Sequence, residues 1–284
     1  MDTRIIFSDD STLEDITINA NDYHSGSDDI AFVAADDKLF IGSYLPFNHL
    51  YIKMGSNVNA NASVMTIKYW DGSNFREVAE LIDETKSSGA TLAQSGFITF
   101  IPHKKYDWRE EDTVDVEDNE EVTDLGSVKI YERYWIQITV SADLTASTDL
   151  AWVGNLFNKN DNDIEGRYPE LANSTTKTNF ESGKTDWEEQ RVEAAKEIIQ
   201  ELKRRNIIKG SGQILERDDF RLASIHKTAE IIYNAFGSAR DEERGKAIKA
   251  FSIAIDGFIA SIDNDRDGRS DSEEREETTA HGVR

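Results

Sequence analysis

The hydrophobic positions of this chain follow two different periods. In residues 1–153 they alternate with polar positions in short runs such as LYIKMG, SVMTIKYW, GFITFI and YWIQITV, which are rich in β-branched and aromatic residues. Alternation with a period of two predicts β-strands. Asp71-Gly72 predicts a tight hairpin after the second run, and Ser95-Gly96 opens another strand. We therefore expect an antiparallel β-sandwich in residues 1–153.

From about residue 185 the hydrophobic period becomes helical. Asp186 with Glu189 three residues later has the form of a capping box. Three apolar stripes then recur at spacings of three or four residues: Val192, Ala195, Ile199 and Leu202; Leu222, Ile225, Ala229, Ile232 and Phe236; Ile248, Phe251, Ile255, Phe258 and Ile262. These stripes predict a three-helix bundle over residues 185–262. Residues 154–184 have little periodicity, and we expect a connector there.

The expected fold class is therefore α+β and multidomain, with an N-terminal antiparallel β-sandwich followed by a small C-terminal α-helical bundle. We expect the last segment, residues 263–284, to be an acidic tail. Residues 110–124 carry nine acids in fifteen positions, which predicts a mobile surface loop within the β-half.

The tail contains an EF-hand-like calcium loop. The ligand positions one, three, five, seven, nine and twelve of that pattern fall on Asp263, Asp265, Asp267, Arg269, Asp271 and Glu274. Gly268 fills position six, where the backbone must turn, and Arg269 offers its carbonyl. Ser270 replaces the usual apolar residue, no second loop exists in the sequence, and no apolar face follows. We expect Ca²⁺ with a structural role, and a solvated acidic tail is the alternative.

Composition narrows the classes of function. The 284 residues include 55 acids against 32 bases, a net charge of −23, which argues against tight binding of nucleic acid or anionic lipid. The same charge suits a surface that DNA slides past. No cysteine is present, so neither disulfides nor thiolate chemistry are available. The sequence has no run of about 18 apolar residues and no basic start followed by an apolar run, so we expect no membrane span and no signal peptide.

Catalytic motifs are missing from the sequence. The five histidines show no zinc-helix spacing, and no G-x-S-x-G elbow, Walker A loop or G-x-G-x-x-G fingerprint occurs. His226 lies beside an apolar stripe and is expected to be a partly buried structural residue. A pair of carboxylates acting as a glycosidase remains an alternative, since acids are plentiful. We expect a protein that is not an enzyme.

The β-half resembles a module found in neck, tail and baseplate proteins of tailed-phage virions. The match spans residues 64–144 and rests on a recurring set of positions, namely Tyr69 to Gly72, Phe75, Asp83, Thr85, Leu92 to Phe100, Trp108, and Tyr134 to Ile136. The acidic loop between Trp108 and Tyr134 is an insertion relative to that pattern. The helical half, residues 185–262, is similar in pattern to the small bundle of phage head–tail connector, or adaptor, proteins.

The resemblance implies a structural virion protein without catalysis. It would be assembled in the host cytoplasm as a homo-oligomeric ring of the neck, with portal and tail or neck proteins as partners and genomic DNA passing without tight binding. A tail or baseplate component is the nearest alternative. A calcium-dependent carbohydrate-binding module is another, and exposed Tyr69, Trp70 and Trp108 would favour it.

Overall fold

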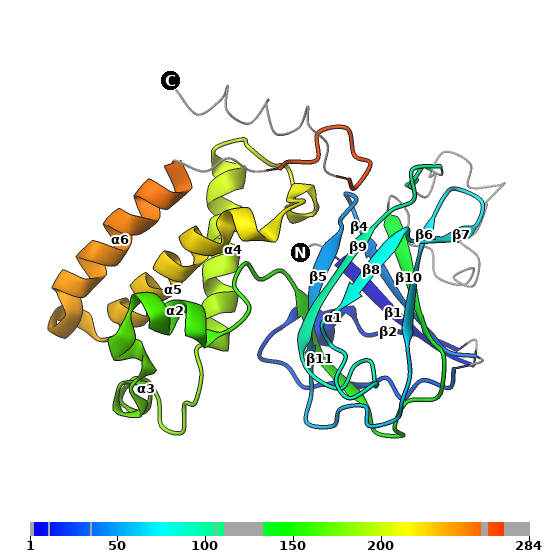
Figure 1. Ribbon diagram of the computed structural model, residues 1–284, viewed down its shortest axis with the longest axis horizontal. Coiled ribbons are helices and arrows are strands. Elements are labelled where there is room, and N and C mark those ends of the chain that lie inside the picture. Colours follow the sequence, from blue (N-terminus) through cyan, green and yellow to red (C-terminus); the bar gives the residue numbers. More distant parts are fainter. Residues whose placement is uncertain are drawn as a thin grey trace. The chain divides into compact units, whose positions relative to one another are not determined.

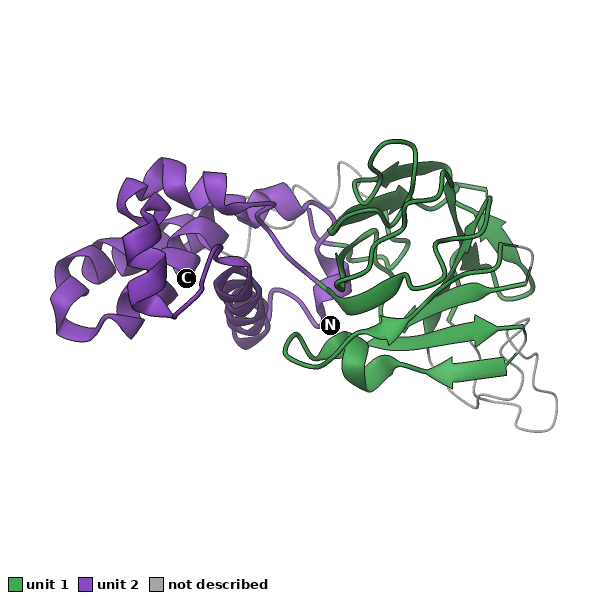
Figure 2. Ribbon diagram, turned by 90° about the horizontal axis from the view of Figure 1, so that it is seen from below, with its two compact units in different colours: residues 1–154, 263–269 green, residues 155–262, 270–284 purple. Residues whose placement is uncertain are grey.

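The computed structural model describes residues 3–10, 12–34, 36–105, 107–110, 133–256 and 261–269. Contacts divide the chain into two units, coloured separately in Figure 2. Unit 1 combines Met1–Gly154 with Asp263–Arg269, and unit 2 holds Asn155–Ile262. Unit 1 is built of strands and unit 2 of helices, which confirms the predicted α+β class. The acidic stretch 110–124 lies outside the described residues, apart from Glu110.

The described strands of unit 1 form two antiparallel sheets (Figure 1). The first sheet has the order β2-β1-β4-β10-β6-β7, and the second has the order β3-β11-β5-β9-β8. The strands, with one short helix, are β1 (Thr3–Asp9), β2 (Thr12–Asp15), α1 (Thr17–Asn21), β3 (Asp28–Asp29), β4 (Lys38–Ser43), β5 (His49–Met54), β6 (Met65–Trp70), β7 (Phe75–Glu77), β8 (Glu80–Asp83), β9 (Gly96–Ile101), β10 (Tyr134–Val140) and β11 (Asp149–Gly154).

Strand β10 is buried on both of its faces, whereas alternation alone would leave one face polar. Tyr134, Ile136 and Ile138 join the main core of unit 1. Trp135, on the opposite face, is 1% exposed and belongs to a second cluster. The strand also pairs with β4 on one side and with β6 on the other. Burial on two faces makes β10 the centre of the first sheet.

The second cluster crosses the whole first sheet, because each of its six strands contributes one residue. These residues are, in sheet order, Leu13, Ile6, Phe40, Trp135, Trp70 and Phe75. Trp135 lies directly opposite Gly42 of β4, and a Cβ atom added to Gly42 would lie 2.8 Å from the indole ring. Glycine at this position thus leaves room for the largest side chain of the row.

The predicted hairpin at Asp71-Gly72 is confirmed. It joins β6 to β7, with Trp70 opposite Phe75. The Asp71 carboxylate accepts hydrogen bonds from the backbone N–H groups of Ser73 and Asn74 at 2.9 and 2.7 Å. Gly72 has a φ of 93°, a left-handed conformation that glycine adopts without strain.

The edge strands of both described sheets are short and acidic. β2, β7, β3 and β8 have four, three, two and four residues, and each contains at least one Asp or Glu. An exposed strand edge offers unpaired N–H and C=O groups to other chains. Short length and carboxylates at all four edges oppose such pairing.

The helices of unit 2 begin earlier in the sequence than its periodicity indicates. They are α2 (Asp161–Arg167), η1 (Pro169–Ala172), α3 (Ser174–Phe180), α4 (Glu188–Arg204), η2 (Ser211–Gln213), η3 (Arg217–Phe220), α5 (Arg221–Ala235), η4 (Gly237–Arg240) and α6 (Asp241–Asp256), where η marks a 3-10 helix. The longer helices α4, α5 and α6 correspond to the three predicted stripes.

The stretch expected to be a connector, residues 154–184, is largely part of the helical core. Ile164 and Leu171 are fully buried with Trp187, Ile232 and other residues of α5 and α6. α2 and α3 have only seven residues each, too few for a helical period to emerge. Their local signal is the cap: Asn160 accepts a hydrogen bond from Asn162 N–H, and Asn173 accepts one from Thr175 N–H.

The third stripe does not continue as a helix to its last predicted member. α6 ends at Asp256, and Phe258 lies outside the described residues. Ile262 forms an isolated β-bridge with Ile214, and Leu215 N–H donates to Ser261 C=O at 3.1 Å. The calcium loop therefore follows an extended bridge and does not begin at a helix end.

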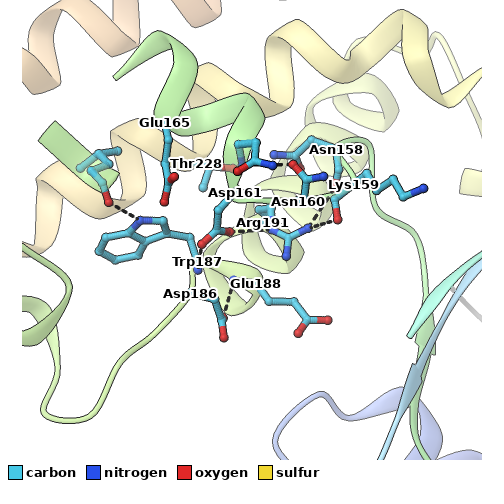
Figure 3. Close-up of polar contacts among 12 residues, drawn as sticks. Asn158, Lys159, Asn160, Asp161, Glu165, Asp186, Trp187, Glu188, Arg191 and Thr228 are labelled. Carbon is cyan, nitrogen blue, oxygen red and sulfur yellow. Dashed lines mark hydrogen bonds and ion pairs between the residues drawn. The ribbon is translucent and has the colours of Figure 1, made fainter. Parts of the chain in front are cut away.

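A buried ion-pair network fastens the start of unit 2 to α4 (Figure 3). The Arg191 guanidinium donates through Nη1 to the carbonyls of Asn158 and Lys159, at 3.1 and 2.7 Å. Its Nε lies 3.4 Å from Asp161 Oδ1, an ion pair without a hydrogen bond. Asp161 Oδ2 also accepts from the backbone N–H of Trp187 at 2.9 Å.

Burial dominates the titration of Asp161. Its pKa is raised by desolvation, while the charges of Arg191 and Lys177 pull it back down. Without the arginine, the buried Asp161 carboxylate would keep only the Trp187 N–H and the Lys177 ammonium to offset its burial, and two backbone carbonyls would lose a charged donor.

We predict that Arg191→Leu lowers the free energy of unfolding of unit 2 by about 3–5 kcal/mol, because it leaves Asp161 buried with less compensation. Arg204→Leu, in the same helix, is the matched control. Arg204 is 72% exposed and paired with Glu201, so its removal should cost less than about 1 kcal/mol. Urea denaturation followed by circular dichroism at 222 nm measures both, and equal losses would contradict the role given to Arg191.

Candidate metal centre

The loop at the end of the described chain belongs to unit 1. Residues 263–269, called the strap from here on, group with the β-sandwich, although unit 2 lies between them and residue 154 in the sequence. The chain thus passes from unit 1 to unit 2 and back again. Of the six predicted ligand residues, Asp263, Asp265, Asp267 and Arg269 lie in the strap, and Asp271 and Glu274 lie outside the described residues.

The Asp263 carboxylate organises the strap. The residue has no exposed surface. Its Oδ1 accepts hydrogen bonds from the backbone N–H groups of Arg266 and Asp267 at 2.6 and 3.2 Å, and its Oδ2 accepts one from Gly268 at 3.1 Å. One side chain therefore folds the next five residues around itself, as the first position of an EF-hand-like loop requires.

Two residues of the strap have left-handed backbone conformations. Arg266 has a φ of 65° and Gly268 a φ of 72°. Gly268 follows the expectation for position six, while the arginine pays some conformational strain that the hydrogen bonds to Asp263 must outweigh. These turns bring the acidic side chains onto one side of the loop.

Three carboxylates converge as the spacing predicts. Oxygen atoms of Asp263, Asp265 and Asp267 all lie within 4.8 Å of one another, and no other such group of three metal-type ligands occurs among the described residues. Carboxylate oxygens at this spacing suit a hard divalent cation. Three of the six predicted ligand residues therefore come together in the described structure. Asp271 and Glu274 lie outside the described residues.

Burial raises the pKa of Asp263 to about 6, and the negative charges of Asp265 and Asp267 act in the same direction. The N–H groups of Gly268 and Arg266 oppose the shift. A carboxyl group with a raised pKa holds its proton more tightly in the folded strap than in the open chain. Without a cation, the strap therefore loses stability as the pH rises from about 4 to about 6. A cation would take the place of that proton.

An internal positive charge competes for one ligand. The Arg269 Nε lies 2.5 Å from Asp267 Oδ2, and the Arg269 backbone N–H donates to Asp267 Oδ1 at 2.7 Å. Both oxygens of Asp267 are therefore engaged. A cation must displace the guanidinium before it can use this carboxylate, which lowers the affinity of the loop.

The residues beneath the strap come from the β-sandwich and carry no signal in the sequence. A Cβ atom added to Gly268 would lie 3.3 Å from Pro102 Cγ and from Trp108 Cε3. The Arg266 side chain forms a hydrogen bond with Tyr134, whose pKa is raised by burial. More than 120 residues separate Tyr134 from Arg266 in the sequence, so local patterns could not predict this support.

Among the described residues, no histidine belongs to this group of ligands. His226 is 7% exposed, as expected for a structural residue, and its Nδ1 lies 2.7 Å from the Tyr168 hydroxyl. Burial lowers the pKa of His226, and the charge of Arg167 adds to that effect. The imidazole is therefore neutral at pH 7 and suited to this hydrogen bond.

Comparisons with protein-family models, with curated proteins and with solved structures found no match to this chain. In the described part of the chain, no helix has the length and apolar character needed to cross a bilayer. What the metal centre can do follows from its own residues: it offers a small cluster of hard oxygen ligands on a loop that is already folded.

We predict that the wild-type protein binds Ca²⁺ with a dissociation constant on the order of 10⁻⁴ M, since the loop is single and Asp267 is paired. Asp265→Asn should weaken binding at least about tenfold. This variant is preferable to Asp263→Ala, because Asp265 is exposed and the hydrogen bonds of Asp263 stay in place.

Isothermal titration calorimetry at pH 7.5 measures the affinity. The control is Glu242→Gln, which removes the same charge from a side chain of α6 that is 79% exposed. It should bind Ca²⁺ like the wild type. Identical affinities for all three proteins, or no heat from the wild type at millimolar Ca²⁺, would show that the strap is only an acidic segment.

Proposed function

We propose that the protein is a structural component of a tailed-phage virion, a head–tail connector that assembles as a homo-oligomeric ring around the DNA channel. The observation that carries this proposal is the way the fold uses the residues of the phage-module resemblance. They are scattered between residues 64 and 144, yet they come together as the framework of one sandwich.

The aromatic members of that pattern divide between the two clusters of unit 1. Trp70, Phe75 and Trp135 belong to the row that crosses the first sheet. Tyr69, Trp108 and Tyr134 belong to the main core. The Tyr69 hydroxyl donates to the His103 carbonyl at 3.1 Å, which ties the loop before Trp108 to β6. Each aromatic residue thus has a place in the framework, as expected if the pattern specifies a module.

The Asp-x-Thr element of the pattern also has a structural role. Asp83 Oδ1 accepts from the backbone N–H and the hydroxyl of Thr85 at 2.9 and 2.5 Å. Asp83 Oδ2 accepts from the Thr91 hydroxyl at 2.5 Å. The Thr85 hydroxyl oxygen in turn accepts from the N–H of Leu92, whose φ is 54°. This network holds the turn that leads into β9.

The same burial weighs against the carbohydrate-binding alternative. Sugar-binding faces present aromatic rings to solvent, whereas Tyr69, Trp70 and Trp108 are 0, 3 and 5% exposed. A tail or baseplate component remains the alternative within the virion class, because the module resemblance applies to it equally.

The charge distribution supports passage of DNA without tight binding. The run of three basic residues at 203–205 is largely neutralised: Arg204 pairs with Glu201, and Arg205 pairs with Glu201 and with Asp256. Hydrogen bonds from Arg204 and Arg205 lower the pKa of Glu201 to about 2, so it stays charged beside them. Little positive charge is left there for phosphate.

In this proposal Ca²⁺ is a structural cofactor of the strap. Sensor loops work in pairs that open a groove between helices, whereas the strap is single and lies on a β-sandwich. Bound Ca²⁺ would hold the strap on unit 1 by neutralising the three acidic side chains.

We predict that the purified full-length protein forms closed rings, alone or when mixed with portal protein. Closed rings arise from heterologous contacts that return to their starting point. Sedimentation velocity should give a discrete oligomer of one mass, and negative-stain images should give rings of uniform diameter. A monomer under both conditions would contradict the connector assignment.

We also predict that duplex DNA is not retained by the protein in a gel-shift assay at physiological salt, because the net charge of −23 repels phosphate. Arg204→Glu should leave this result unchanged, since Arg204 is already paired. Retention that disappears with rising salt would mean that a basic surface exists and that the electrostatic argument fails.

A further inference from the structure

The strap covers a tryptophan of the main core of unit 1. Trp108 is 5% exposed, and the backbone of Gly268 lies against it and against Pro102. The indole is also the centre of a ring cluster, with contacts at centroid distances of 5.3 to 6.1 Å to Phe47, Tyr69, Phe100 and Tyr134. The strap thus contributes to burying a side chain that four other rings depend on for their packing.

Arg266 of the strap makes a second contact with unit 1. Arg266 is exposed, and its side chain forms a hydrogen bond with Tyr134, a member of the same ring cluster. The strap therefore has two contacts of different kinds with unit 1: a tight backbone contact at Gly268 and a polar one at Arg266.

Closure of the strap has costs as well as gains. The indole Nε1–H of Trp108 is buried and has no hydrogen-bond partner among the described residues. The Asp263 carboxylate is fully buried as well. Water would solvate both groups if the strap opened. In the closed state, the apolar contact at Trp108 and the N–H groups around Asp263 offset these losses.

We propose that the strap is a detachable clasp of unit 1. Closed, it seals the Trp108 ring cluster and returns the chain from unit 2 to the β-sandwich. Open, it bares Trp108 to water and leaves residue 154 as the single point where the chain connects unit 2 to the folded sandwich. This inference needs neither a bound cation nor the virion assignment, because it rests on contacts between the strap and the sandwich alone.

The experiment is to measure solvent exchange of the tryptophan indole N–H groups by NMR in the full chain, with a chelator present to exclude cations. The Trp108 signal is assigned by its loss in Trp108→Phe. Trp187 is an internal reference, because its Nε1–H donates to the Leu171 carbonyl at 3.0 Å inside unit 2. In the wild type, the Trp108 indole should exchange much more slowly than a free indole.

Gly268→Val should open the clasp, because the new Cβ atom would lie 3.3 Å from Trp108 and Pro102, which must then give way, and because the backbone there is left-handed. Exchange at Trp108 should become at least about tenfold faster, with Trp187 unchanged. Gly89→Val is the matched control: Gly89 has a φ of 89°, and nothing lies within 4 Å of an added Cβ atom. Gly89→Val imposes the same kind of backbone strain without a contact to Trp108. The Trp108 indole N–H should therefore exchange as slowly as in the wild type.

Arg266→Gln is the second variant, in case Gly268→Val disturbs the whole sandwich and alters every indole signal. It removes only the contact with Tyr134 and should accelerate exchange at Trp108 by a smaller factor. Fast exchange at Trp108 in the wild type would overturn the proposal. The proposal would also fail if the Trp108 indole exchanged as slowly in Gly268→Val and Arg266→Gln as it does in the wild type.

Discussion

The burial of one carboxylate, that of Asp263, governs the C-terminal part of this structure. A fully buried carboxylate needs hydrogen bonds, a proton or a cation, because water no longer solvates it. Three backbone N–H groups meet that need and fold the strap in doing so. The turn at Gly268, the contact with Trp108 and the approach of Asp265 and Asp267 all follow from this arrangement. The metal centre and the clasp are therefore two consequences of the same interaction.

A loop that is already folded would bind a cation with a different balance of free energy than a loop that the cation must fold. Little backbone entropy remains to be lost, which favours binding. The exchange of Arg269 for the cation at Asp267 opposes it. The candidate site and the fold of the strap thus depend on partly different residues: all three carboxylates converge at the site, but only Asp263 also folds the strap around itself. Substitutions can separate the two roles, which would be impossible if the metal alone folded the loop.

The sequence predicts a helix or strand best where the element buries only one of its faces. The alternating strands and the hairpin at Asp71-Gly72 emerge because apolar side chains on one face leave a periodic record. The helices α2 and α3 leave no periodic pattern in residues 154–184, because they are short and their asparagine caps are weaker signals than an apolar stripe. The ligand spacing from Asp263 to Asp267 could be read directly, since it lies within five residues. Its support from Trp108 and Tyr134 could not, because that contact depends on how the whole sandwich closes.

The four acidic sheet edges limit how copies of this chain can meet. Strand-to-strand pairing between neighbours would place carboxylates of both partners side by side along an edge of at most four residues. In the proposed ring, contacts between neighbours would be left to loops and to side chains on the sheet faces and helices, where the shape of the surfaces sets the geometry. Such contacts can specify one angle between neighbours, whereas an open ladder adds strands without limit. In physical terms, the edges favour an assembly of finite size over a fibre.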